Sequence, residues 1–150
     1  MHLAFLQILI GALVAGLDAG RAYTDWPLMA GGILPLDPLA LEPVWRNFFE
    51  NEGTVQFVHR TAGYLLFLLG IAAWIKGRRS QYSRTRRAFD WVMVLLFGQL
   101  VLGIGTVLYA APWPLAIAHQ FTAVVLWAMI LRARFLGRYP RFDSLRGAAT

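Results

Sequence analysis

The sequence contains no cysteine among its 150 residues. This absence excludes disulfide bonds, thiolate metal sites and a cysteine nucleophile. Acidic residues are also scarce, with eight Asp and Glu against fourteen Lys and Arg. Charged residues make up only 15% of the chain and hydrophobic residues 58%, whereas soluble domains are usually about 45–50% apolar. The composition therefore predicts a membrane protein.

Four apolar runs carry most of this hydrophobic content, at residues 3–19, 55–75, 89–110 and 115–131. A helix needs about 20 apolar residues to cross a bilayer, and these runs are close to that length. The surface of so small a soluble domain would leave little room to hide all four in one core. The sequence therefore predicts an all-α membrane protein, a four-transmembrane-helix bundle that forms a single domain over residues 1–150.

Basic residues gather beside these runs. Six lie in the segment 76–87, which is predicted to be a loop between spans, and five in the tail 132–150, namely Lys76, Arg78, Arg79, Arg84, Arg86, Arg87, Arg132, Arg134, Arg138, Arg141 and Arg146. An excess of Lys and Arg next to a span marks the cytoplasmic side, so both segments and both termini are predicted to be inside. The partner is then the lipid bilayer, and this placement argues against nucleic acid, although the net charge is +6.

The segment between the first two spans, residues 21–54, is polar, and we call it the long loop. It carries four prolines and five acids against two bases, namely Pro27, Pro35, Pro38, Pro43, Asp25, Asp37, Glu42, Glu50, Glu52, Arg21 and Arg46. This charge places it on the outer face. Residues 42–51, which include several aromatic side chains, are predicted to form a short interfacial helix.

Two histidines, His59 and His119, are each the fifth residue of a span that runs from outside to inside. They should therefore lie at one depth, about one helical turn below the outer surface. An ionisable side chain within a bilayer is costly and suggests a function. A neutral imidazole offers a lone pair to a metal, so this pair suits the two axial positions of a haem iron held between helices. The alternative is that each histidine only forms hydrogen bonds to neighbouring helices.

Other site chemistries have less support. A closed zinc or copper site needs three or four donors, and the remaining histidine, His2, is predicted at the opposite face of the membrane. No grouping of serine, histidine and acid typical of a hydrolase is visible. The sequence therefore favours a haem over these sites.

Polar residues beside the histidines are further candidates. Arg60 can reach the outer interface, where it would pair either with a haem propionate or with Asp18 or an acid of the long loop. Gln56 and Gln120 are placed to orient an imidazole or to satisfy a helix end. The pattern Gln7-x-x-x-Gly11 returns as Gln99-x-x-x-Gly103. Such glycines make room for a flat ligand or allow close helix packing.

Several ordered motifs resemble haem A synthase of the proteobacterial and mitochondrial type. The resemblance runs from about residue 4 to about residue 125. Its motifs are Gly11 to Gly20, Trp26-Pro27-Leu28-Met29, Trp45 to Asn51, Val55 to Arg60, Gln99-x-x-x-Gly103-Ile104-x-Thr106 and His119-Gln120.

The resemblance implies an oxidoreductase of the bacterial inner (cell) membrane, or of the mitochondrial inner membrane in a eukaryote. Such enzymes convert a methyl group of haem O to the formyl group of haem A for cytochrome oxidase assembly. They have two four-helix halves, and this chain resembles the carboxyl-terminal half. In that half two histidines, here His59 and His119, bind a haem b. Haem O and haem O synthase are the implied substrate and partner.

The resemblance also implies what is missing. The amino-terminal half carries a glutamate three residues before its first histidine, and Gln56 stands at that position here. The expected partner is an amino-terminal half or a second copy of this chain, although a second copy would supply no glutamate. A stand-alone four-helix b-type cytochrome is the alternative function. A membrane scaffold whose histidines serve only packing is the third.

Overall fold

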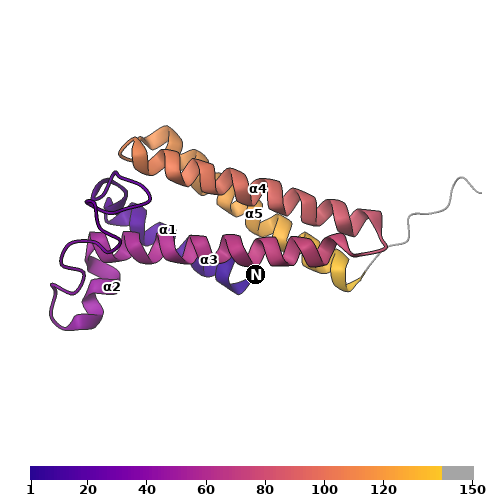
Figure 1. The fold of residues 1–150 in the computed structure, drawn as a ribbon, viewed down its shortest axis with the longest axis horizontal. Coiled ribbons are helices and arrows are strands. Elements are labelled where there is room, and N and C mark those ends of the chain that lie inside the picture. The colour runs from indigo at the N-terminus through magenta and orange to yellow at the C-terminus, as the bar shows by residue number, and fades with distance from the viewer. Residues whose placement is uncertain (140–150) are drawn as a thin grey trace, which may run out of the picture.

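The computed structural model describes residues 1–139, and the regular secondary structure in that range is helical. The long helices are α1 (His2–Gly16), α3 (Glu52–Arg78), α4 (Ser83–Leu108) and α5 (Trp113–Arg138) (Figure 1). Three short segments lie between α1 and α3, namely η1 (Ala19–Arg21), η2 (Val44–Arg46) and α2 (Asn47–Glu50). The all-α prediction is confirmed. Arg141 and Arg146 of the predicted basic tail lie outside the described residues.

The helices differ in length. α3, α4 and α5 are each long and apolar enough to cross a membrane, whereas α1 is a shorter apolar helix of 15 residues. In Figure 1 the N-terminus lies near the middle of the molecule, so α1 runs beside only one half of the bundle. The four predicted apolar segments are thus present as helices, and the crossing of a membrane by α1 stays a prediction.

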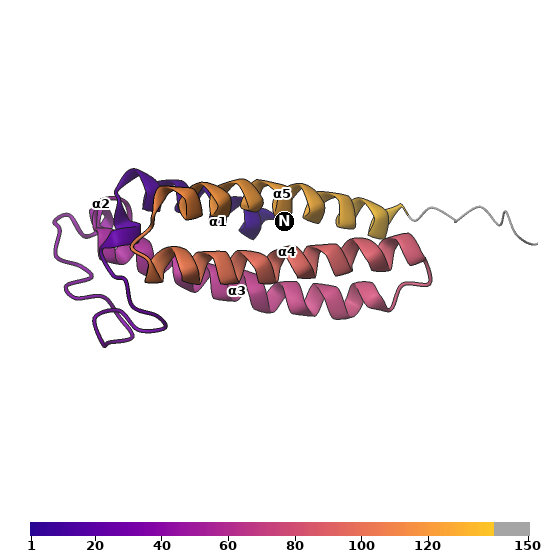
Figure 2. The same cartoon turned by 90° about the horizontal axis from the view of Figure 1, so that it is seen from above.

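The basic segment predicted as a loop is mostly helical. α3 continues through Arg78 and α4 begins at Ser83, which leaves a connection of residues 79–82. Lys and Arg are good helix formers, and cations in the last turn of α3 interact favourably with its carboxyl end. We call this end of the molecule, where α3 and α5 end and α4 begins, the basic end. The long loop lies at the opposite end (Figures 1 and 2).

Packing between the helices buries a small core. Its buried residues come from α4 and α5, namely Ala88, Val92, Leu96, Leu126, Ala133 and Leu136. Most large apolar side chains instead point outward, and Leu68, Phe97 and Phe121 are 63%, 57% and 68% exposed. A helix that is apolar on its outward face as well as its packed face is typical of a lipid environment.

The long loop is folded back on itself by side-chain hydrogen bonds. Asn47 is fully buried, and its amide bonds the backbone of Leu41 and Val44. The α3 helix begins with Asn51 as its N-cap, whose side chain accepts from the Thr54 amide at 3.0 Å. The predicted short helix over residues 42–51 is found as η2 and α2, and its position at a membrane interface stays a prediction.

Gly77 of α3 lies in close contact with Phe89 of α4. A Cβ atom at this buried position would lie 2.3–2.8 Å from three ring atoms of Phe89. Replacing Gly77 by alanine should therefore lower the free energy of unfolding of the purified chain in detergent by about 1–3 kcal/mol, because the aromatic ring has to move. Thermal unfolding followed by circular dichroism measures this.

The matched control for that substitution is Gly137→Ala. A Cβ at Gly137 would lie 3.8 Å from the same Phe89 ring, which is an ordinary contact. This variant should be neutral or slightly more stable, because alanine favours helix over glycine. Equal effects of the two substitutions would contradict the tight contact at Gly77.

Candidate functional site: a histidine pair between helices

The structure brings His59 of α3 and His119 of α5 together. Their ring centroids lie 6.5 Å apart, and the ring planes are nearly perpendicular, at 82°. Both residues are partly buried, near the end of the bundle that carries the long loop. The sequence predicts that the two histidines lie at one depth, and the structure shows that their rings are also close to each other. A sequence pattern alone does not specify this closeness.

Each histidine lies against a glycine of the preceding helix. A Cβ added to Gly11 of α1 would lie 3.1 Å from His59 Cε1, and one added to Gly103 of α4 would lie 3.2 Å from His119 Cε1. Both distances are shorter than ordinary van der Waals contacts, so a side chain at either glycine would crowd the ring. The repeat of Gln, Gly and His along the sequence is therefore a repeat in space, in which α1 with α3 resembles α4 with α5.

Gln7 is the polar partner of His59. Its Nε2 atom lies 3.2 Å from His59 Nδ1 and donates to the His59 carbonyl at 3.0 Å. The side-chain carbonyl oxygen of Gln7, Oε1, is buried and has no hydrogen-bond partner. The sequence interpretation gave this orienting role to Gln56 or Gln120 and missed Gln7. The repeated Gln-x-x-x-Gly pattern is the feature of the sequence that could have identified Gln7.

The second half of the repeat is bonded differently. Gln99, the counterpart of Gln7, donates to the hydroxyl of Thr122, which in turn donates to the Ala118 carbonyl at 2.7 Å. His119 Nδ1 is therefore left buried without a hydrogen-bond partner. A buried imidazole nitrogen with no partner is costly, and a ligand or a small rearrangement would satisfy it.

Gln56 bonds the long loop instead of an imidazole. Its side chain is only 2% exposed, and its Nε2 donates to the Tyr23 carbonyl at 3.0 Å. Gln120 is exposed on α5. The glutamine that the structure places against His59 is Gln7, and the orienting role of any glutamine stays a prediction.

Arg60 also binds the long loop. Its guanidinium donates to the backbone carbonyls of Tyr23, Asp25 and Leu28 at 3.0, 3.0 and 3.1 Å. Asp18, one of its expected partners, instead lies 3.9 Å from Arg21. The contact with the long loop expected for Arg60 is therefore present, but through backbone oxygens rather than acidic side chains.

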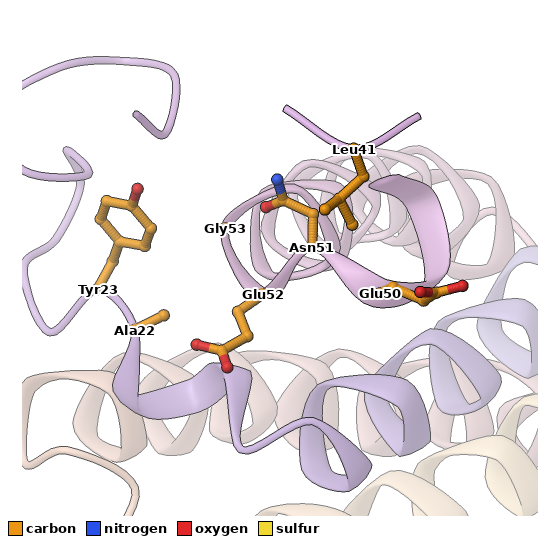
Figure 3. Close-up of a pocket in the computed structure, with 7 residues that line it drawn as sticks. All are labelled: Ala22, Tyr23, Leu41, Glu50, Asn51, Glu52 and Gly53. Carbon is orange, nitrogen blue, oxygen red and sulfur yellow. The ribbon is translucent and has the colours of Figure 1, made fainter. Parts of the chain in front are cut away.

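A cavity of about 420 Å³ lies between the start of the long loop and the start of α3, and Figure 3 shows the side chains that line it. Tyr23 borders one side, and Asn51 and Glu52 the other. Glu50, which also lines it, is bonded to Arg46 at 2.5 Å, and this hydrogen bond lowers the pKa of Glu50. The cavity is separate from the histidine pair.

The histidine pair fits an iron that has two protein ligands. A metal–imidazole bond is about 2 Å long, so a metal between two rings places their centroids roughly 6 Å apart. The observed 6.5 Å agrees with this. Among residues 1–139 no group of three His, Cys, Asp or Glu could hold a metal. A closed zinc site is thus disfavoured, whereas a haem supplies the other four ligands itself.

The fold and the site together define a bundle of apolar helices, of membrane-spanning length, with an interhelical histidine pair. The chain belongs to the COX15-CtaA family of cytochrome oxidase assembly proteins, whose family model matches residues 1–131.

Several curated relatives are named heme A synthase. The chain is 66% identical to the one from Jannaschia sp. (strain CCS1) over 149 residues, and 68% identical to that of Dinoroseobacter shibae over 148 residues. It is 63% identical to that of Ruegeria pomeroyi over 147 residues. These alignments cover 98–99% of this chain but 39% of each relative, so the chain spans about two fifths of the length of these relatives. No solved structure matches the chain.

Proposed function

We propose that this chain is the haem-b-binding carboxyl-terminal half of a haem A synthase, and that His59 and His119 are the two axial ligands of the haem. The observation that carries the proposal is the histidine pair itself, with ring centroids 6.5 Å apart and a glycine against each ring. The relatives named heme A synthase, which match nearly the whole chain, support the same function.

In the proposed enzyme the methyl group of haem O is oxidised to the formyl group of haem A for cytochrome oxidase assembly. A haem held by both His59 and His119 would supply electron transfer. The chain's own residues hold and orient the ligand rings. Gly11 and Gly103 leave no side chain between each ring and the adjacent helix.

Gln7 is proposed to fix the orientation of His59. A ligating imidazole commonly donates its second ring N–H to an oxygen acceptor. Gln7 Nε2 lies 3.2 Å from Nδ1 and 3.4 Å from Nε2 of the His59 ring, and its hydrogen bond to the His59 carbonyl at 3.0 Å holds the carboxamide beside the ring. His119 Nδ1 has no such acceptor among its described neighbours, so the two ligands are not equivalent.

The proposed membrane topology has four spans, with both termini and the basic end in the cytoplasm and the long loop outside. Its support is the concentration of Lys and Arg at the basic end and of Asp and Glu in the long loop. This places the histidine pair nearer the outer surface of the inner membrane of a bacterial cell. The relatives named above are bacterial.

The proposed partner is an amino-terminal half that carries the glutamate, with haem O as substrate and haem O synthase as its source. Gln56 supports the proposal that the catalytic glutamate belongs to the amino-terminal half. It occupies the position of that glutamate, is buried, and uses its amide to bind the long loop, so it offers no carboxylate near the histidines. A second copy of this chain would add another glutamine and no acid.

The test is haem A formation in membranes that contain haem O. The chain expressed alone should bind haem b and form no haem A, whereas the chain expressed with an amino-terminal half should form haem A. Haem b binding without haem A in both cases would favour the alternative, a stand-alone b-type cytochrome. A normally folded but colourless chain would contradict both functions.

The glycine beside each ligand provides a further prediction. Gly103→Ala should lower the affinity for haem roughly 10-fold, because the new Cβ would press on the His119 ring. Losses of this size are typical when the surroundings of a metal ligand are changed. Haem titration of the apoprotein, followed by absorbance, measures this. Gly98→Ala on the same helix is the control, because a Cβ there would meet nothing within 4 Å. Equal losses in both variants would rule out the proposed contact.

A further inference from the structure

A second cavity, of about 240 Å³, opens at the basic end between α4 and α5. Arg84 from the first turns of α4 and Arg132 from α5 line it, together with Phe135 and Leu136. Beside it the Thr85 hydroxyl donates to the Leu136 carbonyl at 3.1 Å, which ties the two helices together. The cavity therefore combines two guanidinium groups with an apolar wall in a fixed position.

The cavity lies at the ends of the apolar segments, among residues of the basic end. The basic end is opposite the long loop in the bundle (Figure 1). The apolar run of α4 begins at residue 89 and that of α5 ends at residue 131. Arg84 is thus about 7 Å beyond the apolar run of α4, at 1.5 Å per residue. The polar zone on each side of a bilayer is roughly 5–7 Å thick. In the proposed membrane topology, on which this inference rests, the cavity is therefore at the level of the lipid headgroups.

Acidic side chains are scarce among the described residues of the basic end. Its one described acid, Asp90, is already bonded to Arg78 at 3.0 Å and to Trp74 at 2.8 Å. Within residues 1–139 no acidic side chain pairs with Arg132. A guanidinium beside a second one favours a phosphate group, which it can bind through paired hydrogen bonds.

We propose that this cavity binds the phosphate of an anionic phospholipid. Arg84 and Arg132 contact the phosphate, and Phe135 and Leu136 contact the first methylene groups of the acyl chains. A lipid is favoured over a soluble anion because half of the lining is apolar, and because Phe135 is 52% exposed at this level. Anionic lipids also concentrate negative charge at the cytoplasmic leaflet, which adds to the attraction.

The test uses the full chain in detergent with phosphatidylglycerol as the probe, and native mass spectrometry counts retained lipid. The double variant Arg84→Gln/Arg132→Gln should bind phosphatidylglycerol roughly 10-fold or more weakly, whereas phosphatidylcholine should bind poorly to both forms. The control, Arg79→Gln/Arg87→Gln, removes the same charge from the same end but from residues that do not line the cavity. It should bind phosphatidylglycerol within about two-fold of the natural chain.

Equal losses in the two double variants would overturn the proposal, because a diffuse basic surface would then explain binding. Competition by inorganic phosphate at the concentration of the lipid would also overturn it in favour of a soluble anion. The haem spectrum separates this proposal from the function proposed above. It should be unchanged in both double variants, so loss of lipid binding with an intact spectrum leaves the histidine site unaffected.

Discussion

His59→Ala and His119→Ala should each abolish the low-spin b-type spectrum of the purified chain. Either change removes one of two imidazoles whose centroids lie 6.5 Å apart, and the described residues offer no third ligand at that place. Loss of a ligand should weaken haem binding by more than the roughly 10–100-fold typical of changes around a ligand. A pyridine haemochrome assay gives the type of haem and the amount per chain.

His2→Ala is the matched control for these two variants. His2 is exposed at the start of α1 and is not one of the two rings of the pair, so its loss should leave the spectrum unchanged. Retention of a full low-spin spectrum by His59→Ala or His119→Ala would show that the pair does not hold the haem. Circular dichroism of each variant separates loss of the ligand from loss of the fold.

Arg60→Leu should release the first part of the long loop from α3, beside the histidine pair. Three backbone carbonyls would lose a charged donor, and each such hydrogen bond contributes about 1.5–3 kcal/mol when well shielded. Because the site is only partly buried, we expect a total loss of roughly 2–4 kcal/mol in the free energy that holds the loop. Hydrogen exchange of the amides of residues 23–32 should become at least roughly 30-fold faster.

Two controls separate this role from others. Arg46→Leu removes an arginine of the same loop whose partner is the exposed Glu50, and such surface pairs contribute about 0–1 kcal/mol, so exchange should change little. Arg60→Lys keeps the charge but lacks the planar fork, and it should lie between the other two variants. If Arg60→Leu instead lost haem with no change in loop exchange, Arg60 would be a propionate ligand and not a loop anchor.

The helical architecture was predictable because it depends on each segment alone. The apolar runs at residues 55–75 and 115–131 lie within helices of membrane-spanning length, and the run at 89–110 lies in a third such helix except for its last two residues. The ends of those helices were less accurate. Lys and Arg continue a helix as readily as they mark a membrane boundary, so α3 and α4 extend into the segment expected to be a loop.

The candidate site was predictable only in part. His59 and His119 occupy equivalent positions in two parallel segments, so the sequence predicts that they lie at one level. The hydrogen-bond partners of the polar side chains could not be predicted from the sequence. Arg60 reaches backbone oxygens more than 30 residues away, and backbone acceptors leave no mark in the pattern of residue types.

The sequence by itself determined a helical chain of membrane type with two histidines at one level, because hydropathy and spacing are local properties. Tertiary structure alone decided that the two rings meet, that Gly11 and Gly103 lie against them, and that Gln7 rather than Gln56 contacts His59. These contacts depend on how each helix is rotated about its axis and on the path of the long loop. Both are set by packing among residues far apart in the chain, so no short stretch of sequence specifies them.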